Sequence, residues 1–155
     1  IDTEPAWAPD GKSLIFTSSR QGGAQVFRYF FDSGKIQRLT YQGNYNATAS
    51  FLPSGNAIVM MHRDKAADGF GIAVQQLKDN SSSRVENLVW SGYDESPSVS
   101  PNGQMVLYAT KVGVRRELKM VSLDGQSQFI LPGQGAVQDP VWSPFTQNGN
   151  QNKGK

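Results

Sequence analysis

Short apolar runs recur along this chain, and proline, glycine and small polar residues separate one run from the next. Three nearly continuous runs, at residues 14–16, 57–61 and 105–109, are typical of β-strands that are covered on both faces. A short apolar stretch precedes each of them, and a partly alternating segment and then a more polar one follow. This order predicts groups of four antiparallel strands whose burial falls from the first two to the last. No stretch shows sustained helical spacing, so we expect an all-β fold.

The same turn motif lies near the start of every group of strands. It reads Pro-Asp-Gly, Pro-Ser-Gly or Pro-Asn-Gly at Pro9, Pro53 and Pro101, and Pro144 continues the series, at intervals of 44, 48 and 43 residues. Proline presets φ and glycine takes the left-handed position, so each motif predicts a tight hairpin between the first two strands. A repeat of about 40–50 residues with four strands is typical of a β-propeller blade. We therefore expect blades at about residues 2–44, 45–93 and 94–136.

The two ends of the chain differ from the repeats. Residues 137–144 predict an added innermost strand of the kind that closes a propeller ring, whereas residues 146–155 show no strand pattern and are expected to be a disordered tail. The first blade begins almost at Ile1, and three blades cannot close a ring. We therefore expect residues 1–145 to be a partial propeller, the C-terminal half of a larger one. We also expect the isolated chain to self-associate through its open faces.

Composition narrows the possible functions. The chain has 155 residues, a mean hydropathy of −0.47 and no apolar run near membrane-spanning length, so we do not expect it to insert into a membrane. Its net charge of +2 is small and its cations are scattered, which argues against a nucleic-acid partner. Cysteine is absent, His62 is the single histidine, and no Gly-x-Ser-x-Gly motif or metal-ligand spacing occurs. We therefore expect no catalytic, cofactor or metal site, and a structural or rim position for His62.

Strand order predicts where a partner would bind. In a four-stranded meander, the connections that lead into the innermost strands and those between the second and third strands lie at one end of the blade. We call this end the axial loop face. The candidate partner-binding residues on it are Thr3, Glu4, Asn46, Thr48, Asp94, Glu95, Ser96 and Asp139. Cations on the outer loops are expected to surround them, namely Arg20, Arg63, Lys65, Lys111, Arg115 and Arg116.

An acidic centre within a basic rim would steer and orient a partner. Because the Glu4 side chain is expected to lie outside the strand core, Glu4→Lys is expected to weaken partner binding with little change in melting temperature. Trp7 and Trp142 are expected to be wedged between blades.

Five segments together resemble one family. They are TEPAWAPDGKSLIFTS at 3–18, QRLT at 37–40, DESPSVSPNG at 94–103, LKMVSLDG at 118–125 and PVWSPF at 140–145. In this combination they resemble the C-terminal part of the TolB family, the periplasmic propeller proteins of the Tol-Pal system, over about residues 2–145. The Pro-x-Trp-Ser-Pro-Asp-Gly element alone is less specific, because propellers of prolyl-oligopeptidase-like peptidases also carry it. The chain departs from the family pattern at Ala49, where the other repeats have proline, and in a longer loop at residues 64–69.

The resemblance implies a six-bladed propeller that follows an N-terminal α/β domain. It also implies a non-enzymatic, periplasmic scaffold that binds the lipoprotein Pal, other Tol proteins and colicin-type peptides, maintains outer-membrane integrity and aids cell division. Thr3 and Glu4 stand where the partner-facing Thr-Glu pair of the family precedes the Pro-x-Trp strand. One alternative is the gating propeller domain of a prolyl-oligopeptidase-like serine peptidase. Another is a purely structural array of blades, which is favoured only if the loop face proves featureless.

Overall fold

The structure, a computed structural model, describes residues 1–77, 84–133 and 136–144, and within them it has twelve β-strands and no helix. Blade 1 contains β1 (Asp2–Trp7), β2 (Ser13–Ser18), β3 (Gln25–Phe30) and β4 (Ile36–Arg38). Blade 2 contains β5 (Tyr45–Phe51), β6 (Ala57–Arg63), β7 (Phe70–Gln76) and β8 (Val85–Gly92). Blade 3 contains β9 (Glu95–Val99), β10 (Met105–Val112), β11 (Arg115–Ser122) and β12 (Gln128–Leu131). The predicted all-β class with three four-stranded antiparallel sheets is confirmed.

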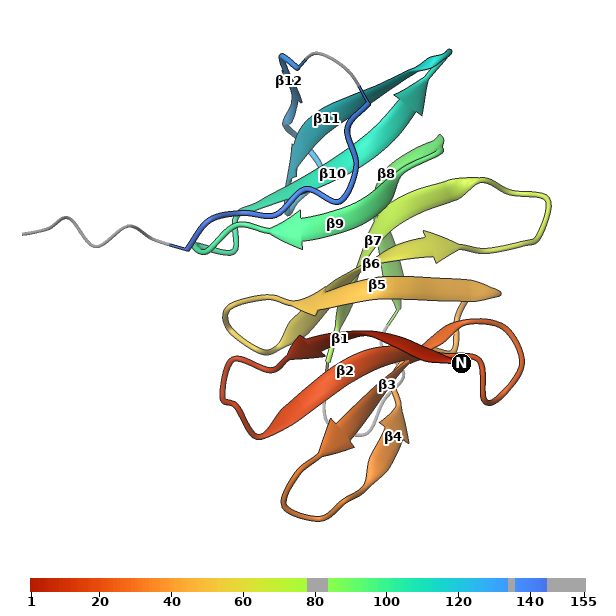
Figure 1. Cartoon of the computed structure of the whole chain (residues 1–155), viewed down its shortest axis with the longest axis vertical. Helices are drawn as coiled ribbons and strands as arrows, with labels where there is room; N and C mark the ends of the chain where they lie inside the picture. Colours follow the sequence, from red (N-terminus) through yellow and green to blue (C-terminus); the bar gives the residue numbers. More distant parts are fainter. Residues whose placement is uncertain (78–83, 134–135, 145–155) are drawn as a thin grey trace, which may run out of the picture.

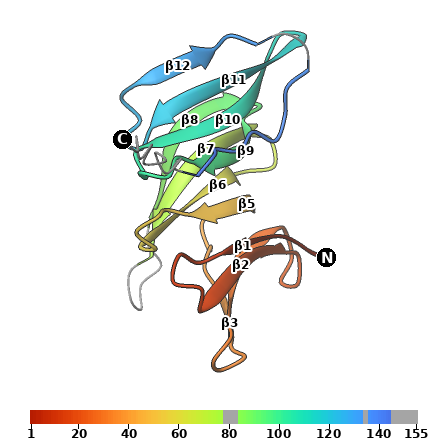
Figure 2. The same cartoon turned by 60° about the vertical axis from the view of Figure 1, so that its left-hand side comes forward.

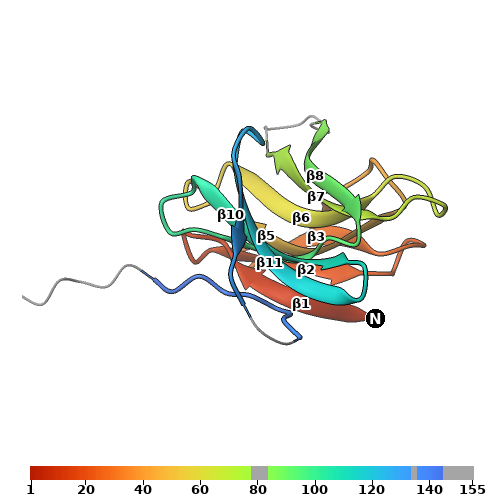
Figure 3. The same cartoon turned by 90° about the horizontal axis from the view of Figure 1, so that it is seen from above.

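Each blade is a simple meander, because the strands of every sheet pair in the order in which they occur in the sequence. The three blades follow one another along the long axis of the molecule (Figures 1 and 2), and they overlie one another when seen from above (Figure 3). The innermost strands β1, β5 and β9 lie side by side, as expected around a propeller axis.

The predicted hairpin turns are present in all three blades. In blade 1, the backbone N–H of Gly11 donates to the carbonyl oxygen of Ala8 at 2.9 Å, and Gly11 has a φ of 68°. Gly55 and Gly103 take the same left-handed conformation in blades 2 and 3. Glycine takes a positive φ without the backbone strain that a side chain brings, which explains why the motif recurs.

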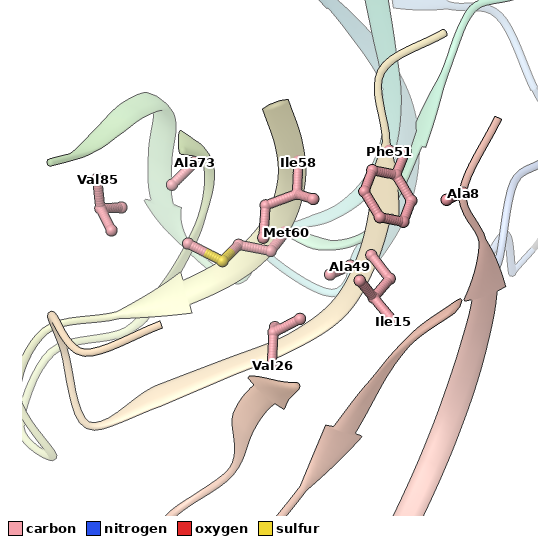
Figure 4. Close-up of a cluster of buried hydrophobic side chains, with 9 residues drawn as sticks. All are labelled: Ala8, Ile15, Val26, Ala49, Phe51, Ile58, Met60, Ala73 and Val85. Atoms are coloured by element: carbon pink, nitrogen blue, oxygen red, sulfur yellow. The ribbon is translucent and has the colours of Figure 1, made fainter. Parts of the chain in front are cut away.

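Two apolar clusters lie between neighbouring blades. Between blades 1 and 2, Ile15 and Val26 pack against Phe51, Ile58 and other side chains of β5 and β6 (Figure 4). An equivalent cluster joins blades 2 and 3. Alternate side chains of β6 therefore pack into different clusters on the two faces of the sheet, which is why this strand is apolar along nearly its whole length.

The prediction that Trp7 is wedged between blades is wrong for this chain. Trp7 is 65% exposed, whereas Phe51, at the same position of the next repeat, is 8% exposed. Phe51 is covered by blade 1, but no blade covers the corresponding face of blade 1 itself. Trp7 instead stacks on Phe31 of its own blade, with ring centroids 5.1 Å apart.

The segment after blade 3 repeats the geometry of an innermost strand without being one. Residues 136–144 run beside β9 (Figure 1), and the backbone N–H of Trp142 donates to Ser98 Oγ at 3.1 Å. They contain no strand, and the described residues offer no further strand with which they could form a ladder. The closing role proposed for residues 137–144 stays a prediction, and the predicted tail at residues 146–155 lies outside the described residues.

Candidate functional site

The innermost strands share an irregularity at the same point of every repeat. The register between the first and second strands shifts between Thr3 and Ala6 in blade 1 and between Ala47 and Ser50 in blade 2, and β9 shows the same shift against β10. Such shifts are β-bulges, which redirect side chains and leave backbone groups unpaired.

Three residues at this irregularity, and a fourth at the equivalent position of the segment after blade 3, are in a strained conformation. In the described part of the chain, the non-glycine residues with positive φ are Glu4 (56°), Thr48 (48°), Ser96 (52°) and Asp139 (49°). They lie at equivalent positions, each five residues before the repeat proline. The left-handed region costs a non-glycine residue about 1–3 kcal/mol, so the rest of each blade must hold the bulge in place.

The strained residues bond to one another between neighbouring repeats. One carboxylate oxygen of Glu4, Oε2, accepts a hydrogen bond from the backbone N–H of Thr48 at 2.8 Å and another from the hydroxyl of Thr17 at 2.7 Å. Asp139 Oδ1 similarly accepts a hydrogen bond from Ser96 Oγ at 2.6 Å. These acidic side chains therefore belong to the scaffold as well as to its surface.

A single hollow of about 360 Å³ lies along the bulges. Each of the four repeats contributes three or four consecutive residues to its lining, and Glu4, Thr48, Ser96 and Asp139 are among them. The hydroxyl groups of Thr48 and Ser50 are buried in its wall, and neither has a hydrogen-bond partner within residues 1–77, 84–133 and 136–144. Buried polar groups in folded proteins are nearly always hydrogen-bonded, so these two hydroxyls are candidates for contact with a ligand that displaces the atoms covering them.

The other predicted site residues lie elsewhere. Thr3 is exposed and Glu95 is half-buried, and Glu95 is in an ion pair with Arg116 of the basic rim. Other cations of the rim are engaged within the protein too: the Arg20 guanidinium bonds to both carboxylate oxygens of Asp2 at 3.0 Å. The described structure thus brings four of the eight predicted residues together at the hollow.

Asn46 and Asp94 lie inside the protein. Asn46 is 0% exposed and Asp94 is 1% exposed. Asp94 accepts hydrogen bonds at 2.6 Å from both the backbone N–H and the hydroxyl of Ser91, which also contacts Thr110 Oγ1 at 2.9 Å. Asn46 similarly contacts His62, which stands at the repeat position of Thr110. Alignment of the repeats would have revealed this pattern of facing polar residues.

These features define a β-propeller fold, in which blades of antiparallel sheet pack against one another and a hollow lies along the innermost strands. Within the described residues, no helix is long and apolar enough to cross a membrane. The chain belongs to the TolB β-propeller family, since the family model described as the TolB beta propeller domain matches residues 1–146.

Individual relatives agree with this membership. The Tol-Pal system protein TolB of Bordetella pertussis is 41% identical over 149 residues, which are 95% of this chain and 33% of that protein. The crystal structure of TolB from Acinetobacter baumannii is 42% identical, with a TM-score of 0.85 over 94% of this chain and 36% of that chain. A putative TolB from Agrobacterium tumefaciens is 25% identical, with a TM-score of 0.75 over 93% of this chain and 55% of that chain. The chain spans about a third or less of the length of the curated relatives that it matches.

Proposed function

We propose that this chain is a non-catalytic, protein-binding part of a periplasmic TolB-type propeller, and that it binds the lipoprotein Pal and colicin-type peptides at its axial loop face. Through Pal and the other Tol proteins it would contribute to outer-membrane integrity and cell division. Membership of the TolB family favours this function over that of a propeller that gates a serine peptidase.

One observation carries the proposal: four strained residues, one from each repeat, line a single hollow. Backbone strain that recurs at one place is expected where geometry serves a function. The hollow offers the carboxylates of Glu4 and Asp139 as acceptors, and the hydroxyls of Thr48 and Ser50 as groups that still lack a partner. A polypeptide segment supplies both N–H donors and C=O acceptors, so it would satisfy these groups.

Proline and alanine make up much of the remaining wall. Pro5, Ala49, Pro97 and Pro140 occupy the same repeat position, directly after the strained residues. They give the hollow an apolar surface that a partner could cover. We infer that a partner segment inserts along the axis, with its polar atoms toward the bulges and apolar atoms against these rings and methyl groups.

The test is the isosteric substitution Thr48→Val, with binding of purified soluble Pal to this chain measured by calorimetry. The Thr48 hydroxyl has no hydrogen-bond partner among the described residues, so its removal should leave the melting temperature unchanged or raise it. If the hydroxyl bonds to Pal, affinity should fall by about tenfold, which corresponds to about 1.4 kcal/mol. Unchanged affinity would show that the partner does not contact the Thr48 hydroxyl. The control is Asp32→Asn, in the turn at the opposite end of blade 1, which should not alter binding.

A further inference from the structure

A connected series of polar side chains is buried between blades 1 and 2 and ends at the single histidine. The hydroxyl of Thr40 donates to Gln25 Oε1 at 2.7 Å. The amide nitrogen of Asn46 donates to the same oxygen and to the carbonyl oxygen of Gln42, both at 2.9 Å. On its other side, the Asn46 amide oxygen lies 2.7 Å from His62 Nδ1.

These contacts determine where His62 carries its proton when it is neutral. Both acceptors of the Asn46 nitrogen are oxygens without hydrogens, so the amide cannot be turned around without losing two hydrogen bonds. The Asn46 oxygen must therefore face Nδ1, and Nδ1 must be the nitrogen that donates. Neutral His62 is thus held as the Nδ1–H tautomer, with a lone pair on Nε2.

None of the described residues donates a hydrogen bond to this lone pair. His62 is 0% exposed, and its Nε2 has no hydrogen-bond partner. Instead, Nε2 lies 3.3 Å from Oδ1 of Asp64, the first residue of the connection between β6 and β7. In the neutral state two acceptors face each other, whereas a proton on Nε2 would make the same contact a charge-assisted hydrogen bond.

We propose that His62 and Asp64 form a proton-dependent contact that fixes the β6–β7 loop, residues 64–69, against the connection between β4 and β5. Below the pKa of His62, a proton taken from solvent binds Nε2 and is shared with the Asp64 carboxylate. Above it, the loop loses this bond and is held only by its remaining contacts. Asn44 lies at this junction, because its backbone N–H points at the carbonyl oxygens of both Arg63 and Asp64, at 3.0 and 3.1 Å.

The surroundings of His62 leave Asp64 as its charged neighbour. The ring meets the edge of Trp90 from β8 at a centroid distance of 5.9 Å, and Gly43 lies directly against its Cε1. From β5 it faces the neutral Asn46, and on β7 its register partner is Gly71. Arg63, the adjacent cation, carries its guanidinium over the rings of Tyr45 and Phe70.

Burial lowers the pKa of His62 below its usual 6.5, and the negative charge of Asp64, together with the hydrogen bond that a protonated Nε2 would donate to it, opposes that shift. The contact is therefore expected to form under mildly acidic conditions. Blade 3 does not repeat this histidine–carboxylate contact, because it has Thr110 and Ser91 at the repeat positions of His62 and Gly43.

The position of the loop connects this contact with the axial loop face. The β6–β7 connection lies at the same end of the blades as the start of β5, because Arg63 pairs with Tyr45 in the ladder. Asn46, which bonds to His62, is two residues from Thr48 in the hollow. If the proposed function holds, acidification would order a loop beside the partner and change partner affinity. This last step rests on the proposed function, whereas the His62–Asp64 contact does not.

The experiment uses the 155-residue chain labelled with ¹⁵N, in which the imidazole spectrum belongs to His62 alone. At neutral to alkaline pH, the ¹⁵N shifts should show the Nδ1–H tautomer. As pH falls, the backbone amides of Asn44 and Lys65 should titrate with the same midpoint as His62. Asp64→Asn should lower that midpoint by about one pKa unit, a tenfold loss of proton affinity, and abolish the coupled change of the loop amides. Asp32→Asn, which removes an exposed carboxylate far from His62, should leave the midpoint unchanged.

Two results would overturn the proposal: a neutral Nε2–H tautomer, or an Asp64→Asn midpoint equal to that of the unaltered chain. Pal affinity measured at the two ends of the titration, in the unaltered chain and in Asp64→Asn, tests the effect on docking. Failure of Pal to bind at any pH would count against the proposed function and leave the NMR result to decide the contact.

Discussion

The Glu4 carboxylate accepts a hydrogen bond from the backbone N–H of Thr48 at 2.8 Å, across the boundary between blades 1 and 2. Both residues hold the same strained position in their repeats. A bulge leaves backbone N–H groups without a strand partner, and Glu4 supplies that partner for the next blade. The side chain that the sequence predicts to face a protein partner is therefore also a link within the scaffold.

This link predicts a loss of stability that depends on the acceptor and not on the charge. Glu4→Ala removes the acceptor of both Thr48 N–H and the Thr17 hydroxyl and should lower the free energy of unfolding by about 1–2 kcal/mol. Glu4→Gln keeps a carbonyl oxygen at the same place and should cost less than about 0.5 kcal/mol. Urea unfolding of the three proteins measures the difference, and equal losses in both variants would show that charge matters more than hydrogen bonding. Glu4→Lys should likewise destabilise the chain, contrary to the expectation from sequence.

Because Gly43 has no side chain, it leaves room for the imidazole ring of His62. A Cβ at Gly43 would collide with the imidazole and lie 2.8 Å from the carbonyl oxygen of Arg63, and Gly43 has a φ of 82°. Gly43→Ala should therefore lower the free energy of unfolding by about 2–4 kcal/mol. Gly22→Ala is the matched control, because Gly22 has a φ of 104° but open space around it, and it should cost about 1 kcal/mol. Similar losses in the two variants would mean that strain alone, without the collision, sets the cost.

Stability should decrease as the solution becomes mildly acidic. Burial lowers the pKa of His62 in the folded chain below the usual 6.5, with Asp64 opposing, so the unfolded chain binds this proton more tightly. The stability contributed by neutral His62 is fully present above 6.5 and is lost as pH falls from there toward the folded pKa. Unfolding by urea at about pH 7.5 and about pH 5.5 should show this loss, and His62→Gln should remove the pH dependence while lowering stability at both pH values. An equal pH dependence in the variant would assign it to other groups.

The open face of blade 1 should drive self-association of the isolated chain. Trp7 is largely exposed and stacks on Phe31, at a position where blade 2 instead buries Phe51 against its neighbour. Covering such an apolar patch is favourable, so sedimentation equilibrium should show dimers or larger species at high concentration. Trp7→Ser should shift the equilibrium toward monomer, whereas Val114→Ser, at the exposed tip between β10 and β11, should not. A monomer at all concentrations would contradict the prediction.

Sequence reasoning worked best where a local rule repeats. The turn glycines Gly11, Gly55 and Gly103 and the apolar second strands follow from φ preference and from two-sided burial, and both signals are visible within a few residues. Sequence reasoning failed where the burial of a side chain depended on a neighbour that is distant in sequence or not in the chain. Trp7 has the pattern of a core residue, but its exposure is set by the absence of a covering blade.

The blades and the candidate site also differ in how far local sequence signals predict them. The sequence by itself determined the all-β blades and their repeat, because strand period, turn chemistry and spacing are local properties. Only the tertiary structure decided that Glu4 bonds to Thr48, that Asn46 and Asp94 turn inward, and that Asp64 faces a buried histidine. Those facts depend on register, on bulges and on contacts between blades, where a shift of one residue reverses which side chains are buried.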